Sequence, residues 1–431
     1  MSTSDAATGP GIQEVDMRKL HKLLTVTLVV LIGFGGTIAV AKKSNVKNEN
    51  KKRDQQAIAE GNTAFALDLY AKLKDQKKDE NLFFSPYSIS TALAMTWAGA
   101  RGETEKQMAQ TLHFTLDQER THPAFAVLQK YLNAGGKKGG YQLNVANALW
   151  GQKEYDFLRE FLERTDKYYS ARLNEVDFVN ETEKTRQRIN AWVEKKTNNK
   201  IKNLIKKGVL KKLTRLVLTN AIYFKGDWAV KFREENTKTA PFHITAKKKV
   251  EAPLMYQMKY FKYAETENLQ ILELPYKGDD LSMVVLLPHG IDGLGGLEKV
   301  LNSKTLKGYT NRLRQREVRV FLPKFKMTCE FSLAGTLAAM GMPNAFTMAA
   351  DFSGMNGRKD LYISAVVHKA FVEVHEEGTE AAAATGVVMT TKAMPTPPPV
   401  FRADHPFLFL IRDNHSGSIL FLGRMMNPAK K

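Results

Sequence analysis

Apolar residues recur at helical spacing in the first half of the chain and mostly at strand spacing in the second half. The spacing over residues 64–70 and again over residues 189–201 predicts two helices that each bury one face. Turn-forming residues at 277–280 and 413–417 lie between apolar runs and predict two hairpins. Helices followed by strands favour an α+β fold. Buried strands are predicted at residues 216–223, 269–274, 283–287, 318–325, 361–374, 407–411 and 419–421.

Length and composition support one folded domain. The chain has 431 residues, of which 43% are hydrophobic, and this fraction excludes a disordered protein. No internal repeat is visible, and no segment after residue 57 resembles an interdomain linker. We therefore expect a single domain over residues 57–431, and a monomer. The only cysteine, Cys329, excludes an intrachain disulfide and a zinc site built from several thiolates.

The N-terminal residues 1–41 have the layout of a signal peptide. A basic cluster at residues 18–22 precedes an apolar run that ends in small residues. Measured from Met17 as the initiator, the segment has ordinary secretory length, so we expect cleavage after Ala41 and a secreted, extracellular protein. The alternative is an uncleaved membrane anchor, because about nineteen apolar residues suffice to span a bilayer. Residues 42–56 are polar and charged and are expected to form a linker.

Motifs of the common enzyme classes are absent from the sequence. It contains no Gly-x-Ser-x-Gly elbow, no Walker phosphate loop and no His-Glu-x-x-His pair. The glycines within residues 290–296 lack the spacing of a dinucleotide loop and indicate a turn. His375, next to Glu376 and Glu377, ends an alternating strand and is expected to be solvated rather than to bind a metal. We therefore expect neither an enzyme nor a metal or cofactor site.

Residues 376–400 have an unusual composition for the interior of a domain. Acidic residues and Gly378 lead into four alanines, and prolines follow from residue 395. The alanines favour a helix, whereas Gly386, the two valines after it and the prolines oppose one. Composition alone predicts an exposed surface loop that proteases can cut.

Several motifs of the chain resemble those of the serpin family and follow in the family's order over residues 62–428. They cover the start of the family's second helix, the helix that crosses its main sheet, the third strand of that sheet, the hinge and the C-terminal strands. The segments are 81–89 (NLFFSPYSI), 189–193 (INAWV), 219–228 (TNAIYFKGDW), 367–370 (VHKA), 376–385 (EEGTEAAAAT), 404–409 (DHPFLF) and 421–424 (FLGR).

The resemblance implies an α+β serpin fold with three β-sheets, about nine helices and an exposed reactive-centre loop over residues 376–401. It also implies a suicide-substrate mechanism, in which a serine protease cuts the loop and the cut loop inserts into the main sheet with the protease covalently attached. Along an inserted strand Thr379 and Ala381 face one side and Glu380 the other, so one face holds only small, uncharged groups. The hinge consists of Glu376, Gly378, Thr379, Glu380, Ala381, Ala382, Ala383, Ala384 and Thr385.

The family's usual spacing of seventeen residues, counted from Glu376, selects Lys392-Ala393 as the cleaved bond. Lys392 is also the only basic residue of the loop, so a trypsin-like protease is the expected partner, although a solvated loop lysine is the plain alternative. Met389-Thr390 offers a second bond for chymotrypsin-like or elastase-like enzymes. Because the stretch after the bond is longer than in some relatives, the exact bond stays open.

Five residues match positions that the family uses when its main sheet opens. Ser85, Ser88, Asn220 and His368 match a polar cluster beneath the opening, and Trp228 matches a tryptophan near the start of the loop. The alternative interpretation is that the four polar residues are hydrogen-bonded core residues and that Trp228 is a packed core aromatic. This interpretation is compatible with a role in sheet opening.

Basic residues are concentrated between Lys184 and Arg215, where twelve bases accompany one acid, within a chain of net charge +19. This segment is interpreted first as a solvated helix face, with a binding site for a heparin-like polyanion as the alternative, and no nucleic acid is expected. A non-inhibitory carrier or chaperone is the other alternative function, and the unbroken hinge favours inhibition. The candidate lysines are Lys195, Lys196, Lys200, Lys202, Lys206, Lys207, Lys211 and Lys212.

Overall fold

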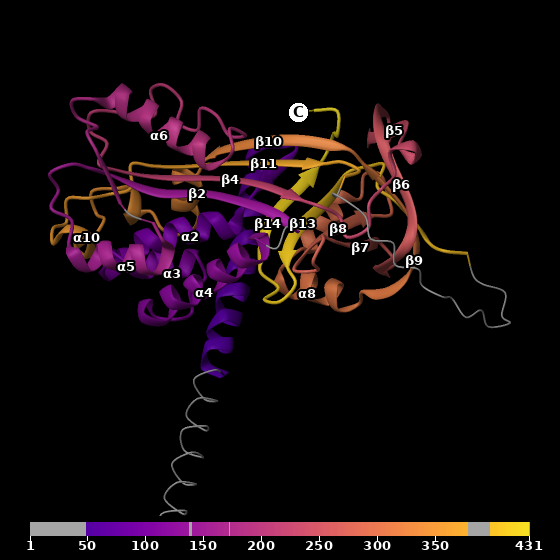
Figure 1. The fold of residues 1–431 in the computed structure, drawn as a ribbon, viewed down its shortest axis with the longest axis horizontal. Helices are drawn as coiled ribbons and strands as arrows, with labels where there is room; N and C mark the ends of the chain where they lie inside the picture. The colour runs from indigo at the N-terminus through magenta and orange to yellow at the C-terminus, as the bar shows by residue number, and fades with distance from the viewer. Residues whose placement is uncertain (1–48, 138–139, 172, 378–396, 431) are drawn as a thin grey trace, which may run out of the picture. The chain divides into compact units, whose positions relative to one another are not determined.

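The protein is described here by a computed structural model. It describes residues 49–137, 140–171, 173–377 and 397–430. The chain divides into two units, Met1–Arg53 and Asp54–Lys431, and the second unit contains the labelled elements (Figure 1). Among the described residues, no helix is both long and apolar enough to cross a membrane.

The first described segment is helical. Residues 49–53 are helical, and so are residues 54–76, which confirms the helix predicted over residues 64–70. The last eight residues of the linker predicted over residues 42–56 are helical, and they include the helix formers Glu, Lys, Arg and Gln. The predicted signal segment lies outside the described residues.

A five-stranded sheet forms the centre of the described fold, and both of its faces are covered. Strand β4 reads as a continuous apolar run because Leu218 and Ile222 belong to the main core, whereas Val217 and Ala221 belong to a second core beneath α6. Figure 1 shows α6 on one face of this sheet and α2 to α5 on the other. The strand order is β10 (Phe325–Ser332), β11 (Ala365–Val374), β4 (Leu216–Gly226), β2 (Tyr141–Gln152) and β3 (Asn174–Val176).

The other sheet has nine strands within the described residues. Strand β6 pairs in turn with β5, β9 and β7, so it continues from one group of strands into another. The three sheets that the family resemblance implies are therefore two hydrogen-bonded sheets here. The order is β1 (Leu82–Phe84), β14 (Ile419–Met425), β13 (Phe407–Asp413), β8 (Leu281–Pro288), β7 (Leu269–Pro275), β6 (Lys248–Glu265), β9 (Arg314–Pro323) and β12 (Val400–Arg402), with β5 (Lys238–Thr245) also paired to β6.

Helices surround the two sheets. Helix α2 begins after Ser85, whose side chain accepts a hydrogen bond from the Ser88 N–H, and Pro86 is its first residue. After the helical residues 49–76, the helices are α2 (Pro86–Trp97), α3 (Gly102–Thr111), α4 (Gln118–Lys137), α5 (Arg159–Tyr169), α6 (Thr182–Lys196), α7 (Leu294–Val300), α8 (Ser303–Asn311), α9 (Ala334–Met340) and α10 (Ser353–Asn356), with short 3-10 turns η1 (Glu234–Asn236) and η2 (Asn344–Phe346).

Both predicted hairpins and most predicted strands are confirmed, with three corrections. The single strand predicted over residues 318–325 is two strands, because Pro323 has no N–H for the ladder and ends β9. Strand β11 begins at Ala365 rather than at residue 361, and Ile201 packs in the second core beyond the end of α6. The long strands β2 and β6 escape the prediction because polar residues interrupt their apolar pattern.

Candidate functional site at the opening of the five-stranded sheet

A row of polar side chains crosses the middle of the five-stranded sheet. The register places Asn147 of β2 opposite Asn220 of β4, and Asn220 opposite His368 of β11. Because residues opposite one another in neighbouring strands point to the same face, the three side chains share one side of the sheet. Asn220 and His368 are fully buried, where an unpaired polar group would be costly.

The start of α2 satisfies this row. Ser85 Oγ accepts a hydrogen bond from the Ser88 N–H at 3.1 Å and donates to the carbonyl of Leu420 at 2.6 Å. The Asn220 amide donates to Ser88 Oγ at 2.7 Å and to Asn147 Oδ1 at 2.6 Å. Asn147 in turn donates to the Ser88 carbonyl at 3.0 Å. The helix start is therefore bonded through side chains to both β2 and β4.

The structure brings together the four polar residues that the family resemblance selects, and it adds Asn147. Sequence analysis missed Asn147, which lies within β2, a strand that the apolar pattern does not predict. An asparagine in a run of alternating apolar residues was the available signal. Its contact with Asn220 depends on the pairing of β2 with β4.

Two hydrogen bonds determine the protonation state of His368. The backbone N–H of Ser85 donates to Nε2 at 3.1 Å, so this nitrogen carries no proton. Nδ1 therefore carries it and donates to Oδ1 of Asn220. Burial lowers the pKa of His368 to about 3, so the imidazole is neutral near pH 7. A second proton, on Nε2, would face the Ser85 N–H.

We expect stability to fall as the pH is lowered from about 6.5 toward 3. Burial, with a smaller effect of Arg164, also lowers the pKa of His122 to about 3. Both native pKa values lie below the ordinary value, so the unfolded chain binds protons that the native state excludes. At pH 5 the loss is about 2 kcal/mol for each histidine. Urea midpoints at about pH 7.5 and pH 5 measure it, and His368→Gln should show a smaller shift than the parent. Equal shifts of the urea midpoint in the parent and in His368→Gln would contradict the assignment of part of the loss to His368.

The end of β11 is held by Trp228. The indole Nε1 donates to the backbone carbonyl of His375 at 3.0 Å. Its ring is stacked on Tyr276, with centroids 4.7 Å apart and an interplanar angle of 9°. The contact lies just before the predicted loop, so Trp228 fixes where the chain leaves the sheet.

Glu376, the first residue of the predicted hinge, is buried and paired, whereas His375 before it, which the sequence predicts to be solvated, is half-buried. Its carboxylate accepts a hydrogen bond from Lys324 at 2.6 Å and one from the Thr237 hydroxyl at 2.7 Å. Burial by itself raises the pKa of Glu376, but Lys324 and Thr237 outweigh it and hold the pKa below its ordinary value. Strand alternation could not show this, because Lys324 lies more than fifty positions away in the chain. Glu376 thus anchors the start of the hinge to Lys324 and Thr237.

Strands β11 and β4 pair directly and in parallel, from Ala365 opposite Val217 to Val372 opposite Phe224. A chain that turns back after β11 would run antiparallel to both strands, so it has the polarity to pair with each of them. We call this junction the seam. The remaining predicted loop residues lie outside the described residues: Gly378, Thr379, Glu380, Ala381, Ala382, Ala383, Ala384, Thr385, Lys392 and Ala393.

Residues 60–428 match the family model described as Serpin (serine protease inhibitor). The chain belongs to the serpin family. It is 47% identical to the leukocyte elastase inhibitor of Bos taurus over 381 residues, which cover 86% of this chain and 100% of the relative. The leukocyte elastase inhibitor of Homo sapiens is 46% identical over 382 residues, with the same coverage. The crystal structure of uncleaved ovalbumin has a TM-score of 0.79 at 32% identity and covers 86% of this chain and 100% of its own.

These relatives confirm the fold and the family that the motifs predict. The curated relatives are named as inhibitors, and this serpin is a protein of the protease-inhibitor kind rather than an enzyme. The family match extends over residues 60–428, so the seam and the polar row belong to a fold that the relatives share.

The eight candidate lysines of the basic segment lie at the C-terminal end of α6 and in the residues after it. All eight predicted lysines are exposed. Lys206 pairs with Glu330 of β10 at 3.0 Å, and the other seven have no carboxylate partner among the described residues. Lys369 of β11 donates to the carbonyl of Lys202 at 2.9 Å. Lys202 and Lys206 therefore lie beside β11 and β10, respectively.

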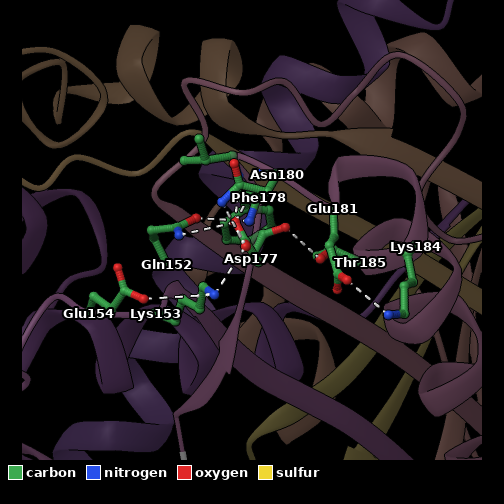
Figure 2. A network of polar contacts seen from close by, with 10 residues as sticks. Gln152, Lys153, Glu154, Asp177, Phe178, Asn180, Glu181, Lys184 and Thr185 are labelled. Atoms are coloured by element: carbon green, nitrogen blue, oxygen red, sulfur yellow. Dashed lines mark hydrogen bonds and ion pairs between the residues drawn. The ribbon is translucent and has the colours of Figure 1, made fainter.

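A polar network anchors the start of α6 to β2 (Figure 2). The Asp177 carboxylate accepts hydrogen bonds from the backbone N–H and the side chain of Asn180, at 2.9 and 3.0 Å, and pairs with Lys153 at 3.2 Å. Hydrogen bonds from Asn180 are the main reason that the pKa of Asp177 lies below its ordinary range. Gln152 of β2 accepts from the Phe178 N–H at 2.8 Å. Because β2 lies beyond β4 from the seam, the start of α6 is fixed on the β4 side of the seam, and α6 also packs in one core with β11 residues.

Proposed function

We propose that this serpin inhibits a serine protease by offering Lys392-Ala393 as a substrate bond and then inserting its hinge into the seam. The main support is the direct parallel pairing of β11 with β4, immediately before an unbroken run of small hinge residues. A strand placed there gains a ladder on both of its edges, which a loop in solvent lacks. The polar row beneath the seam supports the same role, since its bonds cross from β2 to β11 and can be exchanged.

The proposed reaction has two competing outcomes. The serine hydroxyl of the protease attacks the carbonyl carbon of Lys392, the peptide bond breaks, and Ala393 leaves with the new amino group. The ester that remains joins Lys392 to the protease. Water can hydrolyse this ester and release cleaved serpin, or the freed hinge can insert first and keep the protease attached. Inhibition requires that insertion be faster than hydrolysis.

In the first version of this proposal, the target is a trypsin-like enzyme that cuts after Lys392. A lysine before the bond suits a pocket with a carboxylate at its base. The relatives named as leukocyte elastase inhibitors support the second version, in which an elastase-like enzyme cuts Met389-Thr390. Mass spectrometry of the peptide released from each complex distinguishes the two bonds.

We expect Lys392→Glu to abolish covalent trapping of trypsin, because the carboxylate would face the acidic base of the pocket. Lys392→Arg is the matched control and should trap trypsin as the parent does. The measurement is the band of protease-serpin complex that survives boiling in SDS. A Lys392→Glu protein that traps trypsin as well as the parent does would show that another bond is used.

A second candidate function is polyanion binding by the basic segment. It is favoured by the seven exposed ammonium groups without a carboxylate partner among the described residues. Each sulfate contact releases counterions, so the salt needed to elute the protein from heparin should fall when lysines are removed. The variant is Lys195, Lys196 and Lys200 to Gln, and the matched control is Lys247, Lys248 and Lys249 to Gln. Equal elution of the two triple variants would count against a dedicated site.

We also propose secretion, with the signal segment ending at Ala41. Its support is the order of basic, apolar and small residues. Expression in a secreting cell and N-terminal sequencing of the product test it. A mature protein that begins at Lys42 is expected, whereas an intact N-terminus in a membrane pellet would favour the anchor.

A further inference from the structure

A lysine-rich segment between α6 and β4 carries two exposed apolar side chains. Residues 206–213 read KKGVLKKL, and we call them the tip. Leu213 is 72% exposed and Val209 is 40% exposed, whereas Leu210 between them is buried in the second core beneath α6. All four lysines of the tip are exposed. The tip therefore presents ammonium groups and apolar side chains to solvent together.

Hydrogen bonds fix the backbone on both sides of Leu213. The Lys211 N–H donates to the Thr214 hydroxyl at 2.9 Å, and the Thr214 N–H donates to the Lys211 carbonyl at 2.9 Å. The guanidinium of Arg215 donates to the carbonyls of Lys212 and Thr214, at 2.8 and 3.0 Å. The side chain of Leu213 is thus held in solvent, because turning it onto the core would break these bonds.

The tip and the residues beside it carry more positive charge than their neighbours offset. Residues 195–215 contain nine bases and no acid. Acids close to this stretch include Glu154 and Asp156, on either side of the Tyr155 that bonds to Arg215, as well as Glu183, Glu194 and Glu330. Glu183 already accepts a hydrogen bond from Arg186 at 2.6 Å, and Glu330 is shared between Lys206 and Lys369. The nine bases outnumber these acids, so the surface stays positive.

An anionic lipid bilayer is complementary to this combination of charge and apolar surface. Lysines near such a bilayer are attracted by its negative surface potential, and apolar side chains gain by entering the boundary between headgroups and acyl chains. A sulfated polysaccharide would pair with the lysines but offers no apolar phase for Val209 and Leu213. The two apolar side chains therefore favour a bilayer as the partner of the tip.

The tip lies at the opposite end of β4 from the start of the predicted loop (Figure 1). Strand β4 begins at Leu216, shortly after the tip, and ends at Gly226, close to the Trp228 that bonds to the carbonyl of His375. The 11 residues of β4 span about 36 Å. A bilayer bound to the tip would thus leave the Trp228 end of the sheet, from which the loop starts, in solution.

We infer that the tip docks this serpin on anionic lipid bilayers, with its lysines over the anionic headgroups and with Val209 and Leu213 inserted among them. The inference goes beyond the proposed function, because bilayer binding requires neither cleavage of Lys392-Ala393 nor the lysines proposed to bind heparin on α6. It also differs from the anchor alternative for residues 1–41, in which an apolar segment crosses the bilayer. Docking concentrates the inhibitor on a surface while its loop stays accessible.

The test places an environment-sensitive fluorophore on the tip of the full-length protein. Leu213→Cys is labelled with a maleimide dye at neutral pH, where Cys329 stays unreactive because burial raises the pKa of its thiol to about 11. With vesicles of phosphatidylcholine and phosphatidylserine, we expect the emission to rise and to shift to the blue. Val300→Cys, at a residue that is 49% exposed in α7, is the matched control and should show neither change. Residues 1–53 are the same in both proteins, so a change at position 213 alone reports the tip.

The charge of the tip is tested in the protein labelled at position 213. Replacing Lys207, Lys211 and Lys212 by Gln should raise the vesicle concentration at half of the emission change roughly a hundredfold, because each lysine near an anionic surface contributes roughly fivefold in affinity. The matched control replaces the three lysines at residues 247–249, in the turn between β5 and β6, and should change that concentration much less.

Four outcomes would overturn the inference. The first is an unchanged emission at position 213 with the anionic vesicles, and the second is an equal change with vesicles of phosphatidylcholine alone. The third is a change with heparin but none with vesicles, which would assign the tip to a polysaccharide. The fourth is an equal half-maximal vesicle concentration for the two triple variants. Melting temperatures equal to that of the parent show that the variants are folded, and none of these outcomes depends on protease trapping.

Discussion

Cleavage of the loop between Glu380 and Lys392 is expected to raise the melting temperature of this serpin by roughly 20 °C. An inserted strand of about ten residues bonds to both β11 and β4, whereas the direct β11–β4 ladder of eight register pairs is lost. The net gain is on the order of ten hydrogen bonds at about 1 kcal/mol each, which rivals the stability of a whole domain.

The measurement is a thermal melt before and after limited proteolysis, with the cut identified by mass spectrometry. The control is protein nicked at the same bond but carrying a substitution that prevents insertion, which should keep the melting temperature of the intact parent. If nicking leaves the melting temperature of the parent unchanged, the hinge does not enter the sheet.

Thr379→Arg is expected to convert the inhibitor into a substrate. In an inserted strand Thr379 lies on the face that otherwise carries Ala381, Ala383 and Thr385, and the substitution would bury a charge there. The penalty for an unpaired buried ion is several kcal/mol, and about 3 kcal/mol on the barrier slows insertion roughly a hundredfold. Hydrolysis of the ester is then faster than insertion, and cleaved serpin accumulates.

The matched control is Glu380→Arg, which places the same guanidinium on the opposite face, where the sequence already carries a charge. It should remain an inhibitor. The assay is the molar ratio of serpin to protease at which protease activity disappears, together with the cleaved product on a gel. A Thr379→Arg protein that still traps protease near one to one would refute insertion and leave the carrier alternative ahead.

Local sequence determined a large part of what is described here. Helix and strand periodicity, the turns at residues 277–280 and 413–417 and the run of small hinge residues are properties of neighbouring residues, and they are visible without a fold. The motifs then identified the family, because their order and content are specific over nearly the whole domain. The alternation along the hinge also assigns Thr379 and Glu380 to opposite faces before any strand is placed.

The contacts that make a site were decided by the tertiary structure. Asn147, Asn220 and His368 meet because three strands distant in sequence adopt one register, and a shift by one residue would separate them. The sequence presents Glu376 only as the first hinge residue, and only the fold places Lys324 and Thr237 beside its carboxylate. Val209 and Leu213 are exposed because the fold places only Leu210 of the tip's apolar side chains against the second core. Periodicity shows which face a side chain occupies, whereas strand pairing, which is set by the packing of the whole domain, decides what lies opposite it.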